Sequence, residues 1–188
     1  MDRIYCYPGT DILVNKLNIQ NHKRLLDAER KLTNLRILDL LENPVKGSFD
    51  LTHLQAIHRY IFQDIYTWAG KIRTVDIAKK TMFCKVQFIQ SQANDIFRKL
   101  KMDHYLEGFS QRDLALKLAF YFSEINALHP FREGNGRSQR EFIRELALHN
   151  GYKLSFAKIS EQEMLDASVD SFLCNYEKME QIFLKSLK

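Results

Sequence analysis

The segment HPFREGNGRSQR at 129–140 constrains the fold most, because it separates two stretches with helical apolar patterns. In the stretch 114–128, apolar residues recur every three or four positions, which is typical of a helix with one buried face. Pro130 disfavours helical geometry for His129, so this helix should end there. The stretch 137–149 repeats the apolar pattern. The segment therefore predicts a short loop between two buried helices, with its second half opening the next helix.

The second half of this segment carries groups that bind a polyphosphate. The start of a helix exposes unpaired N–H groups and a partial positive charge. Gly134 and Gly136 let the backbone approach a phosphate closely, and Asn135 carries an amide that can bind a phosphate oxygen. Arg137 and Arg140 lie three residues apart on one helical face, so both can address one polyphosphate.

The same segment adds a metal ligand and a proton acceptor. Glu133 offers the oxygen ligand that Mg²⁺ prefers, and Mg²⁺ usually takes only one or two carboxylates plus phosphate oxygens. The imidazole of His129 can accept a proton at neutral pH. Taken singly, each feature has an ordinary interpretation: a structural histidine, a glycine turn or a solvated face. The occurrence of the histidine, the carboxylate, the glycines and the arginines together favours a nucleotide site. Phe131 is interpreted as a core anchor of the loop.

The segment resembles the Fic (filamentation induced by cAMP) family pattern, HPFx[D/E]GNGRxxR, at every specified position. Residues 51–77 resemble the helix and Trp-Ala-Gly turn of that family, and residues 7–19 resemble the N-terminal segment of the small bacterial toxins called FicT. The resemblance implies a protein adenylyltransferase, which transfers AMP from ATP to a protein hydroxyl and releases pyrophosphate. It also implies a mainly α fold, a Fic-type helical bundle with one small β-hairpin.

The resemblance assigns roles to the residues of the segment. His129 corresponds to the general base, and Glu133 to the ligand of a Mg²⁺ ion that bridges the α- and β-phosphates. The run Gly134, Asn135 and Gly136 corresponds to the phosphate cradle. Arg137 then pairs with the β-phosphate and Arg140 with the γ-phosphate.

Other reactions of this fold remain open. The related Doc toxins carry Lys at the position of Gly136 and phosphorylate their target, so the glycine favours AMP transfer over kinase activity. Transfer of phosphocholine or UMP also occurs in the wider family. The remaining alternative is a non-catalytic interaction module that binds nucleotide. The presence of His129 argues against it, since a binder needs no base.

The stretch 74–86 alternates partly as two short strands around Lys79 and Lys80. By resemblance it corresponds to the flap, a hairpin that aligns the target backbone by strand addition. An ordinary surface hairpin is the alternative. Lys79, Lys80, Thr81 and Met82 are expected near the nucleotide or the target.

Many Fic enzymes carry an inhibitory pattern, [S/T]xxxE[G/N], whose Glu pairs with the second motif arginine. No Ser or Thr of this chain is followed by Glu four positions on. We therefore expect the toxin half of a toxin–antitoxin pair, with a small antitoxin supplying a Glu to Arg140. FicT toxins modify the ATPase subunits of DNA gyrase and topoisomerase IV, which makes these subunits the expected protein targets by resemblance.

The chain is expected to form one domain, 1–188, with an N-terminal segment 1–50, a core 51–150 and C-terminal helices 151–188. Leu25, Ala28, Leu32, Leu35 and Leu38 predict the buried stripe of the first helix. Helical patterns cover the ranges 20–42, 51–64, 87–103, 111–128, 137–149, 161–173 and 175–187.

Composition limits the partners and the compartment. The net charge of +5 suits nucleotides or acidic protein surfaces but does not form a concentrated basic patch, so direct nucleic-acid binding is not expected. No stretch approaches the roughly 20 apolar residues of a membrane span. Three cysteines without a CxxC pair indicate a reduced, cytoplasmic protein. His53 and His58 lie five residues apart, which does not match a helical zinc pair, and are expected at exposed or core-edge positions.

Overall fold

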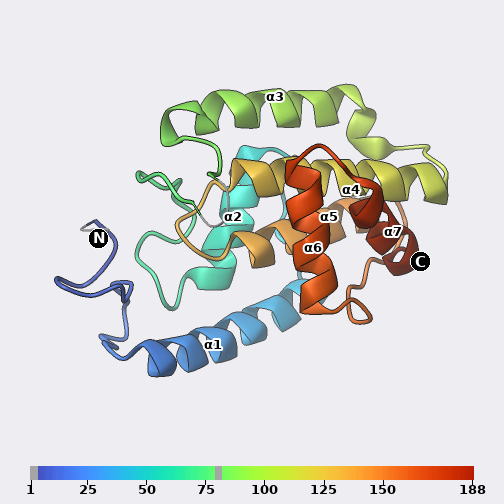
Figure 1. The fold of residues 1–188 in the computed structure, drawn as a ribbon. Helices are drawn as coiled ribbons and strands as arrows, with labels where there is room; N and C mark the ends of the chain where they lie inside the picture. Colours follow the sequence, from blue (N-terminus) through green and yellow to red (C-terminus); the bar gives the residue numbers. More distant parts are fainter. Residues whose placement is uncertain (1–3, 79–81) are drawn as a thin grey trace.

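The computed structural model describes residues 4–78 and 82–188, and in these ranges the regular secondary structure is almost entirely helical (Figure 1). The mainly α prediction is therefore confirmed. Two short 3₁₀ turns, Val86–Phe88 and His104–Leu106, precede α3 and α4. The α-helices are α1 (His22–Glu42), α2 (Leu51–Phe62), α3 (Ile89–Met102), α4 (Gln111–Leu128), α5 (Asn135–His149), α6 (Glu161–Phe172) and α7 (Glu177–Ser186).

Polar caps start four of these helices. Asn21, Asp50, Ser110 and Ser160 stand before α1, α2, α4 and α6, and each side chain accepts a hydrogen bond from the backbone N–H three residues on. Such a cap satisfies one of the N–H groups that a helix start leaves unpaired, and its loss typically costs about 1 kcal/mol. The predicted cap at Asp50 is confirmed.

The helices surround α4 and α5, which lie in the middle of the molecule (Figure 1). Helix α1 runs along one side of the molecule and α3 along the opposite side, while α6 and α7 pack against each other and against α4. All seven described helices contribute side chains to one buried apolar cluster. The apolar faces predicted for α2, α4 and α5 belong to this cluster, and Phe131 of the loop is buried in it, as predicted.

The predicted stripe of α1 is wrong in its C-terminal half. Leu35 and Leu38 are 65% and 61% exposed, whereas Glu29 and Thr33 are buried. The buried side of α1 faces α5, where both polar side chains contact Arg137. A partner on a distant helix therefore decides which face of α1 turns inward.

The predicted hairpin at 74–86 is not confirmed. The described part of this stretch shows only an isolated antiparallel bridge between Ala78 and Met82. Neighbouring backbone groups bond elsewhere: the N–H of Cys84 donates to a carbonyl of α4 at 3.1 Å, and the N–H of Val86 donates to the Asp76 carboxylate at 2.8 Å. These contacts compete with the strand-to-strand ladder that a hairpin requires.

Of the residues expected in the flap, Lys79, Lys80 and Thr81 lie outside the described residues. Met82 is half exposed and borders a groove of about 350 Å³ together with Phe83 and Leu128. Its proximity to nucleotide or target stays a prediction. Among the described residues, no helix has both the length and the apolar character needed to cross a membrane.

Candidate nucleotide site

The loop between α4 and α5 lies where the sequence predicted it. His129 follows the last residue of α4 with φ 47°, a left-handed conformation that ends the helix before Pro130. Gly134, with φ 81°, stands directly before α5. L-residues with a side chain rarely adopt this conformation, so the glycine permits the sharp entry into α5.

Asn135 closes the loop from inside. Its side-chain oxygen accepts the N–H of Phe131 at 2.8 Å, and its side-chain nitrogen donates to the Phe131 carbonyl at 2.7 Å. The side-chain amide is buried and engaged in these two bonds. The structure therefore gives this amide a loop-closing contact rather than the predicted phosphate contact, and the backbone N–H is the group of Asn135 that suits an anion.

The first turn of α5 exposes the backbone N–H groups on which the predicted anion site depends. Helix α5 begins at Asn135, and the N–H of Ser138 donates to the carbonyl of Gly134 at 3.2 Å. The N–H groups of 135–137 have no acceptor within their own helix. Together with the partial positive charge of a helix start, these N–H groups suit phosphate oxygens.

The ring of His129 is largely buried under the C-terminal part of the expected flap, 74–86. Phe83 stacks on it in parallel, with ring centroids 3.7 Å apart and planes inclined by 11°. The carbonyl of His129 accepts a hydrogen bond from Nε of Arg73 at 2.8 Å. Both the backbone and the ring plane of this histidine are therefore held in place.

Glu133 presents a carboxylate that fits a magnesium–nucleotide complex. Its side chain is 47% exposed, and Oε1 accepts the N–H of Gly134 at 2.8 Å. In the described parts of the chain, no group of three or more His, Cys, Asp or Glu residues could hold a metal on its own. A single open carboxylate beside a phosphate site suits Mg²⁺, which completes its shell with phosphate oxygens and water.

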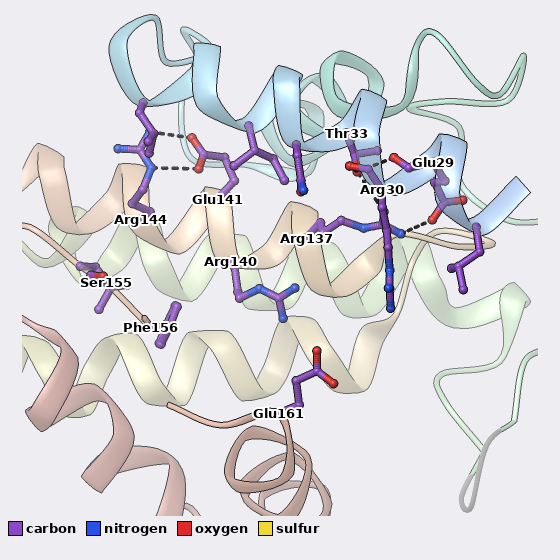
Figure 2. A pocket seen from close by; sticks show the side chains of 15 residues that line it. Glu29, Arg30, Thr33, Arg137, Arg140, Glu141, Arg144, Ser155, Phe156 and Glu161 are labelled. Atoms are coloured by element: carbon purple, nitrogen blue, oxygen red, sulfur yellow. Dashed lines mark hydrogen bonds and ion pairs between the residues drawn. The ribbon is translucent and has the colours of Figure 1, made fainter. Parts of the chain in front are cut away.

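The two motif arginines lie on one groove but differ in their partners (Figure 2). Nη2 of Arg137 lies 2.5 Å from Oε1 of Glu29, and Nη1 donates to the Thr33 hydroxyl at 3.1 Å. Arg140 points away from α1 toward the side of Glu161. Within 4–78 and 82–188, no residue forms a hydrogen bond or ion pair with Arg140, and burial together with the charge of Arg137 lowers its pKa.

The groove that contains both arginines has a volume of about 600 Å³. It runs between α1 and α5, and the segment before α6 closes its far side (Figure 2). Leu26, Ile37 and Leu41 line the α1 wall, while Arg140 and Glu161 lie across it. The α1 wall is therefore mixed, since Glu29, Arg30, Thr33 and Asn34 also line it, whereas α5 contributes Arg137, Arg140 and Arg144.

Sequence reasoning missed His58 of α2, which supports the loop between α4 and α5 from its buried side. Its ring is buried, not at an exposed or core-edge position, and stacks on Phe131 with centroids 3.9 Å apart. Nδ1 accepts the N–H of Gly70 at 2.8 Å, so Nε2 carries the proton and donates to the carbonyl of Glu133 at 2.9 Å. Burial lowers the pKa of His58 to about 4, which keeps it neutral at physiological pH. Its place on the buried face of α2 was the only available signal.

Arg73 was missed as well, and nothing in the sequence marks it. Its guanidinium is buried and donates to the carbonyls of His129, Val75 and Cys84. Its backbone N–H also donates to the carbonyl of Pro130 at 2.9 Å. One side chain thus joins the end of α4 to both sides of the expected flap.

Comparison with known proteins agrees with this geometry. The Fic/DOC family model matches residues 48–147. The protein adenylyltransferase VbhT of Bartonella schoenbuchensis is 38% identical over 184 residues, which cover 97% of this chain and 38% of VbhT. A protein of Escherichia coli K12 named probable protein adenylyltransferase Fic is 39% identical over 183 residues, covering 96% of this chain and 90% of that protein.

The fold is also similar to that of solved structures. The N-terminal Fic domain of a VirB-translocated effector of Bartonella quintana, crystallised with bound ADP, has a TM-score of 0.94 and 28% identity. The match covers 98% of this chain and 94% of that chain. BepC of Bartonella tribocorum, crystallised with AMPPNP, has a TM-score of 0.93 at 24% identity and supports the fold alone.

Proposed function

This chain belongs to the Fic/DOC family, and from that premise we propose that it transfers AMP from ATP to a hydroxyl side chain of a target protein, releasing pyrophosphate. It is a protein adenylyltransferase, as its relatives are named. The observation that carries the proposal is the loop between α4 and α5. It places His129, the open carboxylate of Glu133 and the unpaired N–H groups of α5 within the nine residues 129–137.

In the proposed reaction, the hydroxyl oxygen of the target attacks the α-phosphorus. A new P–O bond forms while the bond from the α-phosphorus to the bridging oxygen breaks, and pyrophosphate leaves with that electron pair. The ring of His129 accepts the hydroxyl proton, and a base of this kind typically contributes about 10²–10⁴-fold to the rate. The N–H groups of 135–137 and the two arginines stabilise the phosphate charge, which is the main demand of phosphate-group transfer.

Glu133 would hold Mg²⁺ in the proposed site. The ion supplies charge neutralisation on the phosphates when it is bound. The half-exposed Glu133 side chain and the neighbouring phosphate site support this assignment.

Incubation with labelled ATP tests the reaction directly. We expect protein labelling from ATP labelled at the α-phosphate, with release of one pyrophosphate per AMP transferred, and no labelling from γ-labelled ATP. Labelling from the γ-phosphate alone would instead assign a kinase. Saturable nucleotide binding without any labelling of protein in a host lysate would instead indicate a non-catalytic module that binds nucleotide.

The target and compartment are finer parts of the proposal. Resemblance to FicT toxins makes the ATPase subunits of DNA gyrase and topoisomerase IV the first proteins to test, and the cytoplasm is the compartment in which they would meet this chain. Mass spectrometry of the labelled band identifies the target and whether Tyr, Thr or Ser carries the AMP.

We also propose that a separate small antitoxin restrains the enzyme by placing a Glu against Arg140. Three observations support it: Arg140 has no partner among the described residues, the groove beside it is open, and Leu26 and Leu41 of α1 are partly exposed on the groove wall. An acidic residue carried on an apolar helix fits these features.

Expression without an antitoxin should therefore arrest bacterial growth. We expect arrest with the wild-type chain and normal growth with the matched His129→Ala variant at the same protein level. Growth curves and immunoblots measure both. A wild-type chain that accumulates as folded, inactive protein and leaves growth unchanged would contradict restraint by a separate partner.

A further inference from the structure

We propose that Glu29 of α1 is a positioning residue that holds Arg137 in its nucleotide-binding orientation. Helix α1 lies outside the part of the chain that the Fic/DOC family model matches, residues 48–147. The inference deepens the proposed function, because it rests on Arg137 as a phosphate ligand. It assigns to α1 a direct part in building the nucleotide site.

The carboxylate of Glu29 is buried and has a partner at each oxygen. Oε1 lies 2.5 Å from Nη2 of Arg137, and Oε2 accepts the hydroxyl hydrogen of Tyr66. Tyr66 is itself buried and stacks on Trp68, with ring centroids 4.2 Å apart. The carboxylate is therefore held between Arg137 of α5 and Tyr66, which lies just before the Trp-Ala-Gly turn at 68–70.

Arg137 is held at two further points. Its Nη1 donates to Oγ1 of Thr33 at 3.1 Å, and the Thr33 hydroxyl donates to the Glu29 carbonyl at 2.8 Å, which leaves an oxygen lone pair for the arginine. The guanidinium carbon also lies 4.6 Å from the ring centroid of Phe62. A free arginine loses about 2 kcal/mol of side-chain entropy when it is immobilised. Here Arg137 is already immobilised in the folded protein, so nucleotide binding does not have to lose this side-chain entropy.

The contacts leave donors for a phosphate. A guanidinium has five N–H donors, and Glu29 and Thr33 use one each. The remaining donors suit phosphate oxygens in the groove that Arg137 shares with Arg140. The orientation of Arg137 and its ability to bind an anion are therefore compatible.

Glu29 also offsets a repulsion between cations. Arg137 and Arg140 are three residues apart on α5, and the charge of Arg137 disfavours the charged form of Arg140. A buried carboxylate beside Arg137 makes this arrangement of two guanidiniums less costly. Glu29→Gln would remove the charge while keeping an oxygen acceptor, whereas Glu29→Ala would remove both.

The alternative is that Glu29 competes with phosphate for Arg137 and so inhibits binding. The geometry favours positioning, because the second oxygen of Glu29 is tied to Tyr66 and the carboxylate cannot leave Arg137 without rearranging the packing of α1. The two roles differ in the sign of the effect. Removal of a positioning residue weakens nucleotide binding, and removal of a competitor strengthens it.

Kinetics of AMP transfer test the proposal. We expect Glu29→Ala to raise the KM for ATP about tenfold or more, with a smaller change in kcat. A tenfold rise in KM corresponds to about 1.4 kcal/mol. Glu29→Gln should give a smaller rise, and Tyr66→Phe a rise in the same direction. Glu42→Gln, which removes an exposed carboxylate at the end of the same helix, is the matched control and should leave KM unchanged.

A double variant separates positioning from a general loss of stability. In an Arg137→Ala background, Glu29→Ala should raise KM no further, because the residue it positions is absent. An equal rise in both backgrounds, or an unchanged or lower KM in the single variants, would overturn the proposal. If Glu29→Ala does not fold, Glu29→Gln and Tyr66→Phe carry the test.

Calorimetry with AMPPNP, an ATP analogue, keeps this inference distinct from the proposed reaction. Weaker binding to the Glu29 variants than to wild type supports positioning even if no AMP transfer occurs. Wild-type binding without transfer would refute the proposed reaction alone. Equal affinity of wild type and variants would refute the positioning role alone.

Discussion

Replacement of His129 by alanine is expected to slow AMP transfer by about 10²–10⁴-fold while nucleotide affinity changes little. The reason is that the proton acceptor and the phosphate-binding groups lie on different parts of the loop. The imidazole lies at the end of α4, whereas the N–H groups and arginines that suit the phosphates belong to α5. Removing the ring takes away the proton acceptor and leaves the phosphate site in place. Single-turnover transfer from α-labelled ATP and calorimetry with AMPPNP measure the two effects.

Two controls sharpen this result. Phe83 loses its stacking partner in His129→Ala, so Phe83→Leu serves as a matched variant that removes the same ring contact while retaining the base. Phe83→Leu should retain more transfer activity than His129→Ala. Transfer by His129→Ala at the wild-type rate would remove His129 from the role of base. An equal loss of nucleotide binding would show that the ring supports the phosphate site instead.

Local patterns predicted the parts of this fold that depend on neighbours in the chain. The end of α4 before Pro130, the cap at Asp50 and the burial of Phe131 each follow from a few adjacent residues, and each is confirmed. The helical ranges follow from apolar spacing for the same reason. They required no knowledge of the tertiary arrangement.

Contacts between distant residues could not be predicted in this way. The inward face of α1 depends on Arg137, which is 108 positions from Glu29. Periodicity alone therefore predicted, wrongly, that Leu35 and Leu38 face the core. Arg73 is another case, because its acceptor on His129 lies 56 positions away. A buried charged residue has no local signature, since its burial depends on partners that only the fold brings together.

The candidate site also combines features that local patterns predicted with contacts that they did not. The sequence placed the chemical groups of the loop in order, but it did not reveal that the Asn135 amide is engaged with Phe131. Nor did it reveal that Arg137 is paired with Glu29, whereas Arg140 has no partner within the described residues. The roles assigned to these residues in catalysis remain proposals that the variants test.

Replacement of Gly134 by alanine is expected to lower the free energy of unfolding by about 2–4 kcal/mol and to reduce AMP transfer more than tenfold. Two costs add at this position. Its φ of 81° strains any residue with a Cβ by about 1 kcal/mol, and the added methyl would lie 2.1 Å from Cζ of Phe62. Phe62 is fully buried, so it cannot move aside without overpacking the core, which typically costs about 1–3 kcal/mol.

Gly136→Ala is the matched control for stability. Gly136 lies in the first turn of α5 without a positive φ, and the atom nearest to an added methyl would be Nη1 of the flexible Arg140 side chain, at 3.4 Å. Because alanine favours a helix over glycine by about 1 kcal/mol, this variant should be at least as stable as the wild type. Chemical denaturation of the two variants side by side measures the difference.

A double variant then separates the clash from the backbone strain. Phe62→Leu shortens the side chain that the new methyl would meet, so Gly134→Ala should destabilise a Phe62→Leu protein less than it destabilises the wild type. The φ strain should persist in both backgrounds, so neither stability nor transfer should return fully. Because an error of about 1 Å at the N–H groups can cost about 10²-fold in rate, transfer should recover less than stability does. A Gly134→Ala protein with wild-type stability and activity would show that the loop does not depend on this close approach.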